Sequence, residues 1–340
     1  MRFDVSIMAP SLSEVPRYVQ VAEEVGFDAL WTSETQHDPF LPLVLAAEHT
    51  QRIGLGTAVA IAFPRSPMVT AHIAWDLQAF SQGRLYLGLG TQVKAHIERR
   101  FGMPWEAPVA KLREYILALR AIWDSWQTGK RLNVRGRFYK LTLMTDFFNP
   151  GPIAHPHIPI FIAGVNRGLI TLAGELCEGF HVHPFHSARY LKDVFLPTLE
   201  EGLRKGGRHR QDIQLASTVF VITGQNEEEM NQTREWVRRQ LAFYASTPTY
   251  RLVLELHGWG EVGERLSYLA ARKRWEEMPK LITDEMLATY AVEAPWDRLA
   301  EALLARYRGL LDRIALYYPF QPEEKERWYS LHEAFARAGR

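Results

Sequence analysis

The chain has 340 residues, of which 47% are hydrophobic and 23% are charged. This balance is ordinary for a soluble globular protein and excludes a disordered chain. Its 40 Lys and Arg side chains against 39 Asp and Glu leave a formal net charge of +1. So small a charge offers no electrostatic footprint for nucleic acid or an anionic membrane. The single cysteine, Cys177, excludes an internal disulfide and a cysteine-based zinc site.

No segment has the pattern of a signal peptide or a membrane span. Asp4 places a charge inside the first apolar run, unlike the basic-then-apolar order of a signal peptide. The apolar stretch 53–77 is interrupted by Arg65, His72 and Asp76, and a span needs ~20 apolar residues. A chain with a single thiol needs no internal disulfide, so it can fold in a reducing compartment. We therefore expect a soluble, cytoplasmic protein.

Short apolar runs alternate with longer amphipathic segments through the first part of the chain. The first predicted strand is Phe3–Met8, followed by a helix that Ser13 caps, Pro16 opens and Gly26 ends. The order of strand and helix then continues, with strands at 29–31, 53–60 and 84–89 and helices beginning at 41, 67 and 111.

The second part of the chain keeps this order but contains two predicted insertions. Residues 132–141 alternate around Gly136, which predicts a hairpin within an insertion at about 127–150. Residues 225–290 have helical spacing and few strand signals, so we interpret them as a helical insertion. Between and after the insertions we expect strands at 160–163, 180–183, 213–222 and 313–318, with helices at 169–177, 188–203, 296–307 and 323–338.

Eight strands that alternate with helices predict an α/β protein of the (β/α)₈ TIM-barrel class. We expect one domain over residues 1–340, whose length above ~250 residues is explained by the insertions. The same alternation also allows a doubly wound open sheet, which is the alternative fold.

A short repeat marks the ends of two predicted strands. The segment 54–59 (GLGTAV) is echoed by 88–93 (GLGTQV), 88 − 54 = 34 residues later. Barrel enzymes place their chemistry at such strand ends. Glycines there let a flat ligand approach the backbone, and we expect that role here. The alternative is a chance match of a common tripeptide.

The segment 161–169 passes from an apolar strand through Gly164 into the start of a helix. Free backbone N–H groups and the helix dipole form an anion site in this arrangement, to which Arg167 would add a charged contact. We therefore predict a site for a phosphate-bearing cofactor. The segment is neither a Walker loop nor a dinucleotide fingerprint, and an ordinary tight turn is the alternative.

Two groups of titratable side chains follow other strands. Glu34, His37 and Asp38 end the second strand, and a His beside a carboxylate can act as general acid or base near neutral pH. The alternative is that Asp38 or Ser33 caps the next helix and that His37 is a surface residue. His181 and His183 share one face of the sixth strand, either as metal ligands or as part of a pocket wall, with simple packing as a third interpretation.

Taken in order, these segments resemble the luciferase-like oxidoreductases (the bacterial luciferase superfamily). More narrowly, they resemble the branch that depends on the deazaflavin coenzyme F-420. The likeness covers roughly 3–203 and 291–320, and it is carried by residues 31–34, 54–67, 83–91, 160–168 and 178–180.

The resemblance implies the position of a cofactor. A non-proline cis peptide between Ala58 and Val59 would lie behind its ring, with Glu34 and His37 near its reactive carbon. Relatives often have an acid–His pair at this point, whereas here Thr35 follows Glu34, so the proton donor stays open. The resemblance also implies that Thr91 and Gln92 line the cofactor. Its phosphate would be held by four residues, namely Ala163, Gly164, Val165 and Asn166.

The leading hypothesis is an oxidoreductase that transfers a hydride between coenzyme F-420 and a small organic substrate. His37 and Glu34 would do the acid–base work, beside a pocket of Phe63, Trp75, His183 and Phe185. One alternative is an FMN-dependent monooxygenase that uses reduced flavin and oxygen. The others are a metal-dependent barrel hydrolase using His181 and His183 and a non-catalytic cofactor-binding protein. We expect no metal in the leading case, and the resemblance implies a homodimer.

Overall fold

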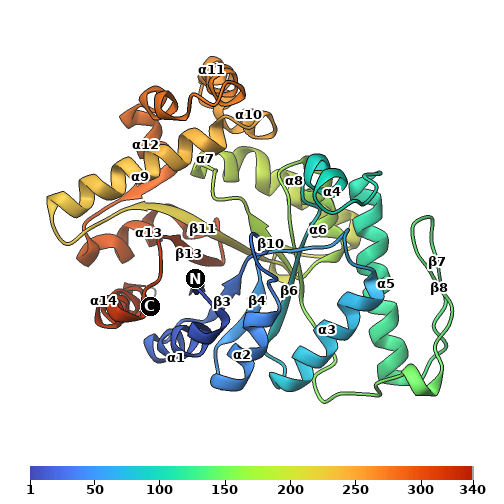
Figure 1. Cartoon of the computed structure of the whole chain (residues 1–340). Helices are drawn as coiled ribbons and strands as arrows, with labels where there is room; N and C mark the ends of the chain where they lie inside the picture. Colours follow the sequence, from blue (N-terminus) through green and yellow to red (C-terminus); the bar gives the residue numbers. More distant parts are fainter. Residues whose placement is uncertain (339–340) are drawn as a thin grey trace.

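The computed structural model describes residues 1–338, and a parallel sheet forms its centre (Figure 1). The strands follow one another in the order β1-β13-β11-β10-β9-β6-β4-β3-β2. Their bounds are β1 Arg2–Phe3, β2 Val5–Ser6, β3 Ala29–Thr32, β4 Gly54–Thr57, β6 Leu85–Gly90, β9 Ile160–Ala163, β10 Gly179–Val182, β11 Gln214–Ile222 and β13 Arg313–Tyr317. In addition, β5 (Ala60–Ile61) pairs with β6.

The sheet closes because β1 and β2 belong to one strand that is interrupted only at Asp4. β1 pairs with β13 on one side, and β2 pairs with β3 on the other. The N–H of Asp4 donates to the carbonyl of Ile314 at 2.8 Å, which continues the pairing through the interruption. The predicted TIM barrel is therefore confirmed, and the doubly wound alternative is wrong. The last two residues of the predicted domain, 339–340, lie outside the described residues.

Helices cover the outside of the barrel (Figure 1). The first of them shows why the sequence folds this way: Pro16 lies in its first turn, and Gly26 ends it with φ +100°, where a side chain would be strained. The helices between strands are α1 Val15–Val25, α2 Leu41–His49, α3 Pro67–Phe80, α4 Lys94–Arg99, α5 Pro108–Thr128, α6 Arg167–Leu176, α7 Ala188–Tyr190, η3 Leu191–Phe195 (a π-helical turn), α8 Leu196–Gly206, α13 Leu299–Tyr307 and α14 Lys325–Ala338.

Both predicted insertions contain the expected kind of structure. β7 (Val134–Arg135) and β8 (Lys140–Leu141) form an antiparallel hairpin. The second insertion holds α9 Glu227–Ala245, η5 Pro248–Tyr250, α10 Arg251–Glu255, α11 Gly260–Ala271, η6 Trp275–Leu281 and α12 Asp284–Tyr290. Its helices α10 and α11 lie above the barrel on the same side as α4, which directly follows β6 (Figure 1). The insertion therefore stands at the C-terminal ends of the strands.

One strand was not predicted from the sequence. β12 (Ala291–Glu293) pairs in parallel with Phe220–Ile222 at the end of β11. β11 spans nine residues, and its end extends beyond the strand pairs of the barrel. β12 covers that end and leads the chain back toward α13. The remaining short helices are η1 Leu12–Glu14, η2 Asp146–Phe148, η4 Arg210–Asp212, η7 Trp296–Arg298 and η8 Pro322–Glu324.

The barrel interior is filled near its N-terminal end by an ion pair beneath aromatic rings. Arg313 donates from Nε and Nη2 to the two carboxylate oxygens of Asp4 at 2.7 and 2.8 Å. Trp31 Nε1 donates to the same carboxylate at 2.8 Å. The guanidinium carbon lies 5.1 Å from the ring centre of Tyr86.

In residues 1–338, no helix is long and apolar enough to cross a membrane.

Candidate functional site

The turn after β4 is held against the end of β3 by backbone contacts. The peptide bond between Ala58 and Val59 is cis, as the resemblance implied. Ala58 N donates to the Thr32 carbonyl at 2.7 Å, and Ser33 Oγ donates to the Ala58 carbonyl at 2.9 Å. The N–H of Glu34 lies 3.4 Å from the Val59 carbonyl. Residues 58–59 and 32–34 thus form one unit at the C-terminal end of the barrel.

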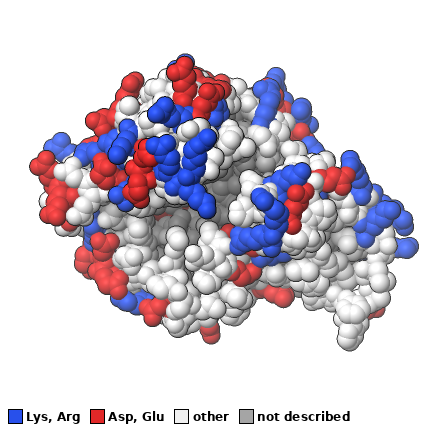
Figure 2. Space-filling model, turned by 45° about the horizontal axis from the view of Figure 1, so that its top comes forward, with Lys and Arg blue, Asp and Glu red and all other residues white. Residues whose placement is uncertain are grey.

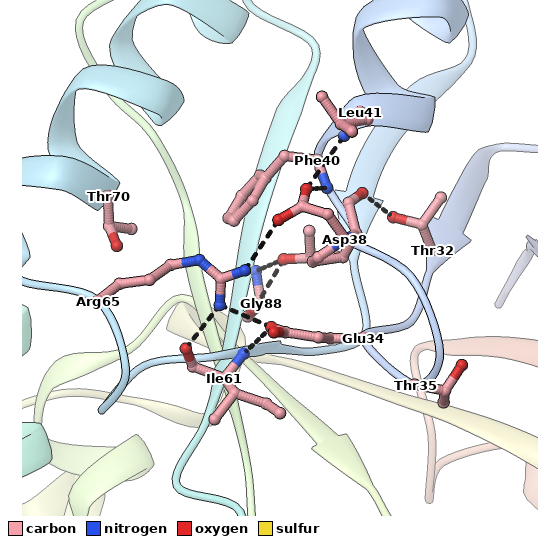
Figure 3. Close-up of polar contacts among 12 residues, drawn as sticks. Thr32, Glu34, Thr35, Asp38, Phe40, Leu41, Ile61, Arg65, Thr70 and Gly88 are labelled. Carbon is pink, nitrogen blue, oxygen red and sulfur yellow. Dashed lines mark hydrogen bonds and ion pairs between the residues drawn. The ribbon is translucent and has the colours of Figure 1, made fainter. Parts of the chain in front are cut away.

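The Glu34 carboxylate completes this unit from its side chain (Figure 3). Its Oε2 accepts the backbone N–H of Ile61 at 2.7 Å and Nη1 of Arg65 at 2.7 Å. The Glu34 side chain is only 7% exposed, so the cation of Arg65 balances a carboxylate that has left water. In this arrangement Glu34 brackets the turn at both its backbone and its side chain. A positioning role follows from the geometry directly, and acid–base action by Glu34 stays a prediction.

Arg65 also reaches the other acidic residue of the loop (Figure 3). Its Nη2 donates to Asp38 Oδ2 at 2.9 Å, while Asp38 Oδ1 accepts the N–H of Phe40 at 2.8 Å. Asp38 thus binds the backbone N–H groups where α2 begins, but the N-cap residue of this helix is Phe40, so the predicted N-cap role of Asp38 is wrong. His37 lies between the two anchored acids and is exposed. Its role in catalysis stays a prediction.

Replacing Arg65 with Met is expected to loosen this loop. The change leaves the buried Glu34 carboxylate without its cation. It also removes the guanidinium that binds Asp38. Hydrogen bonds to charged groups contribute roughly 1.5–3 kcal/mol, so we expect a loss of about this size in the free energy of unfolding. Denaturant unfolding measures it, with Arg167→Met, an exposed Arg bound to Glu201, as the control. Equal effects of both changes would contradict the structural role of Arg65.

The glycines of the two echoed segments have a different role from the one expected. A Cβ on Gly56 would lie 2.3 Å from the Trp31 ring, and a Cβ on Gly88 would lie 1.8 Å from the Thr57 carbonyl oxygen. A Cβ on Gly90 would meet Val59 Cγ2 at 2.6 Å. The space beside these glycines is filled by the chain's own atoms. They permit close packing inside the barrel, and our expectation that they make room for a ligand is wrong.

The predicted cofactor residues lie at the same end of the barrel. Gly90 and Ala163 are neighbours across the β6–β9 pair, and Ala163 and Ala58 are half-buried. Thr91 follows β6 and bonds to the Gln92 carbonyl at 3.1 Å. Small side chains thus border the opening on this side.

The start of α6 lies beyond β9, as predicted. Asn166 Oδ1 accepts the N–H of Leu169 at 2.9 Å and caps the helix. The N–H groups of Arg167 and Gly168 have no hydrogen-bond partner within the described chain, which is the normal state of a first helical turn. Such groups bind anions. A Cβ on Gly164 would lie 2.4 Å from Leu169 Cδ1, so this glycine is required by packing.

A narrow hollow joins the end of β9 to the end of β10. Gly164 and Val165 line it on one side, and His183 and Phe185 line it on the other. Tyr250, from the helical insertion, closes the hollow and stacks on His183 with ring centres 4.3 Å apart. The structure therefore brings two predicted phosphate residues and two predicted pocket residues together.

The other two predicted pocket residues lie elsewhere. Trp75 is buried on α3 outside the barrel, where it packs on Trp126 and donates from Nε1 to the Gly151 carbonyl at 3.1 Å. Phe63 is buried beneath Trp105 and the Lys111 ammonium, 4.7 Å from that nitrogen. Neither side chain lines the hollow. Spacing along the chain could not tell which face of α3 meets the barrel.

The two histidines predicted for one strand lie in different surroundings, because His181 is on β10 inside the barrel whereas His183 follows β10 and lines the hollow. His181 lies edge-on to Trp31 with ring centres 4.7 Å apart, and its Nε2 is buried without a hydrogen-bond partner. Burial, followed by the charge of Arg313, lowers the pKa of His181 to about 3. Among residues 1–338, no three His, Cys, Asp or Glu side chains are grouped as metal ligands. The hydrolase hypothesis therefore gains no support from the donor set.

The opening of the barrel carries charged side chains at its rim. Figure 2 shows a hollowed region in the middle of this face, with Lys and Arg side chains on two sides of it and Asp and Glu side chains among them.

Sequence reasoning missed three residues of this region. Arg65 binds carboxylates that lie 27 and 31 positions earlier, a pairing that no local pattern reveals. Tyr244 and Tyr250 come from the insertion, whose side of the barrel was not assigned. The order of the elements was the available signal. A segment that directly follows a barrel strand begins at the C-terminal face of the barrel, so the insertion after the strand at 213–222 could have been placed there.

The closed parallel barrel, with polar and glycine-containing strand ends at one opening, has the architecture of TIM-barrel enzymes. Comparison with known families makes this specific, because the model of the luciferase-like monooxygenase family matches residues 1–313. The chain belongs to this family.

Similar proteins include two relatives from sequence and one solved structure. An uncharacterized protein of Mycobacterium tuberculosis is 48% identical over 86% of each chain. A 5,10-methylenetetrahydromethanopterin reductase of Archaeoglobus fulgidus is 27% identical over 92% of each chain. The solved structure of the coenzyme F-420-dependent tetrahydromethanopterin reductase from Methanopyrus kandleri has a TM-score of 0.80 at 20% identity, covering 99% of this chain and 98% of that one. The family and the reductase of Archaeoglobus fulgidus support a coenzyme-dependent oxidoreductase, and the solved structure supports the fold.

Proposed function

We propose that the protein transfers a hydride between coenzyme F-420 and a small organic substrate. One observation carries the proposal: Ala58 after β4, Thr91 after β6 and Ala163 at the end of β9 are small residues at the C-terminal end of the barrel, and α6, which follows β9, begins with N–H groups that are unbonded within the described residues. A flat ring with a phosphate on its side chain needs those two features together. The reductase from Methanopyrus kandleri, which depends on this coenzyme, has the same fold.

The residues present fit a deazaflavin. Ala58, Val59, Thr91 and Gln92 would border the ring, and the N–H groups at the start of α6, with Ala163–Asn166, would hold the phosphate. When bound, the coenzyme supplies two-electron hydride chemistry. The chain's own task is to orient that ring, and Arg65 holds Glu34 and Asp38 on either side of His37 for this purpose.

FMN is the second candidate, since the matching family model describes luciferase-like monooxygenases. Two assays separate the candidates. The protein is mixed anaerobically with reduced F-420 and a panel of small aldehydes, ketones and imines, and coenzyme absorbance is followed. Oxygenated product is then measured with reduced FMN, oxygen and the same panel, because free reduced FMN consumes oxygen without any protein. We expect oxidation of F-420 and no oxygenated product with FMN. An oxygenated product with FMN, and no reaction of F-420, would overturn the proposal.

The proposal includes a homodimer in the cytoplasm. Cys177 is the single cysteine, so the chain folds without an internal disulfide and is compatible with a reducing compartment. The neighbouring helices α2 and α3 carry one acidic residue each, Glu48 and Asp76. They also expose large apolar side chains, namely Leu41, Val44, Val69 and Phe80. Such a surface favours contact with a second copy.

We expect Val44→Glu combined with Val69→Glu to convert a dimer into a monomer. The two carboxylates would have to lose water on association, which is costly without partners. Light scattering after size-exclusion chromatography measures the mass. Tyr329→Glu, an exposed aromatic on α14, serves as the control and is expected to stay dimeric. A monomeric unaltered protein would contradict the dimer.

A further inference from the structure

The hollow between β9, β10 and the helical insertion is small and uncharged. Its volume is about 20 Å³, and no Asp, Glu, Lys or Arg is among the described residues that line it. The polar side chains of the lining are those of His183, Tyr190, Tyr250 and Thr249, and the other lining residues are apolar. A space of this size accommodates roughly one oxygen-sized group. A charged group that entered it would lose water without gaining a counter-ion.

The orientation of the His183 ring is fixed by three contacts. Its Nδ1 accepts the backbone N–H of Phe185 at 3.1 Å. Tyr250 stacks on one face with ring centres 4.3 Å apart, and Tyr244 lies edge-on at 4.8 Å. Tyr244 is itself held by a 2.8 Å hydrogen bond between its hydroxyl and that of Tyr317 on β13.

These contacts decide which nitrogen of His183 carries hydrogen. Because Nδ1 accepts a hydrogen bond, the neutral ring has its hydrogen on Nε2. Nε2 has no partner within residues 1–338 and, unlike Nε2 of His181, it is not sealed from solvent. Burial, and to a smaller extent the nearby His186, lower the pKa of His183 to about 3, so the ring is neutral at pH 7.

We propose that His183 Nε2–H donates a hydrogen bond to the carbonyl or hydroxyl oxygen of an uncharged substrate, and that this oxygen alone occupies the hollow between Val165 and Tyr250. This inference rests on the proposed function, which identifies the hollow as part of the substrate site. It narrows the group that contacts His183 to a neutral carbonyl or alcohol oxygen, whereas the coenzyme's phosphate would lie outside the hollow, at the N–H groups at the start of α6. Tyr244 and Tyr250 are positioning residues that act through the His183 ring.

Nitrogen-15 NMR of histidine-labelled protein tests the inference without turnover. Cyclohexanone and cyclohexanecarboxylate serve as matched probes that differ in the charge of the oxygen-bearing group. We expect His183 to show a proton on Nε2 and to shift that signal with the ketone but not with the carboxylate. Equal shifts with both probes, or a proton on Nδ1, would overturn it, as would no shift at a ketone concentration high enough to saturate.

Two variants sharpen the result. His183→Phe keeps an aromatic ring between the tyrosines and removes the donor, so ketone binding measured by calorimetry should weaken about tenfold. His183→Gln restores an N–H donor and should recover part of the loss. Unchanged ketone affinity in His183→Phe would contradict the inference. Because no coenzyme is added, failure of F-420 to bind would count against the proposed function alone.

Discussion

Replacing Arg313 with Met is expected to lower the free energy of unfolding by about 3–5 kcal/mol. The side chains of Arg313 and Asp4 are 0% and 1% exposed, and the change leaves a carboxylate in the barrel interior with no cation. Burial already raises the pKa of Asp4 against the opposing effect of Arg313. Thermal or denaturant unfolding of both proteins measures the loss.

Two further variants define the control for this experiment. Asp4→Leu combined with Arg313→Met removes both charges and should recover part of the stability, because no unpaired charge remains buried. Arg17→Met breaks an exposed pair with Glu323 and should change stability little. The buried pair would not be the cause if Arg313→Met and Arg17→Met gave the same small change.

His37→Ala is expected to retain coenzyme binding and to lower turnover by ~10²–10⁴-fold, the usual contribution of a general acid or base. His37 is exposed on a loop whose acids on both sides are bound to Arg65, so its loss leaves the loop in place. Steady-state rates and a coenzyme titration measure the two quantities separately. His49→Ala, at the end of α2 and bonded to its own helix, is the control. Unchanged turnover in His37→Ala would remove His37 from the mechanism.

Periodicity was sufficient to predict the fold because the barrel strands are mostly apolar and several of the helices that follow them have start or stop signals in the sequence. Gly26 after α1 acts as expected, whereas the expected cap Ser13 is wrong because Glu14 is the N-cap residue of α1, and the cap that Asn166 provides for α6 was not predicted. β12 escaped prediction because three residues are too short for a pattern. Its pairing depends on the length of β11, which is a property of another part of the chain.

The candidate site could be predicted only in part, for a related reason. Strand ends were identified correctly, so Glu34, Ala163 and His183 all lie at the opening. Their contacts could not be inferred, because Arg65 and Tyr250 approach from other segments. The glycines at 56, 88 and 90 show the same limit, since a glycine required by packing and a glycine required by a ligand look alike in sequence.

The central claim is that this opening binds a deazaflavin, and an equilibrium titration tests it most directly. Purified protein is titrated with coenzyme F-420 and separately with FMN, and absorbance and fluorescence are followed. The account predicts saturable, tight binding of F-420 and much weaker binding of FMN. Tight binding of FMN alone would contradict it and favour an oxygen-using monooxygenase, and binding of neither would show that the start of α6 is not a phosphate site.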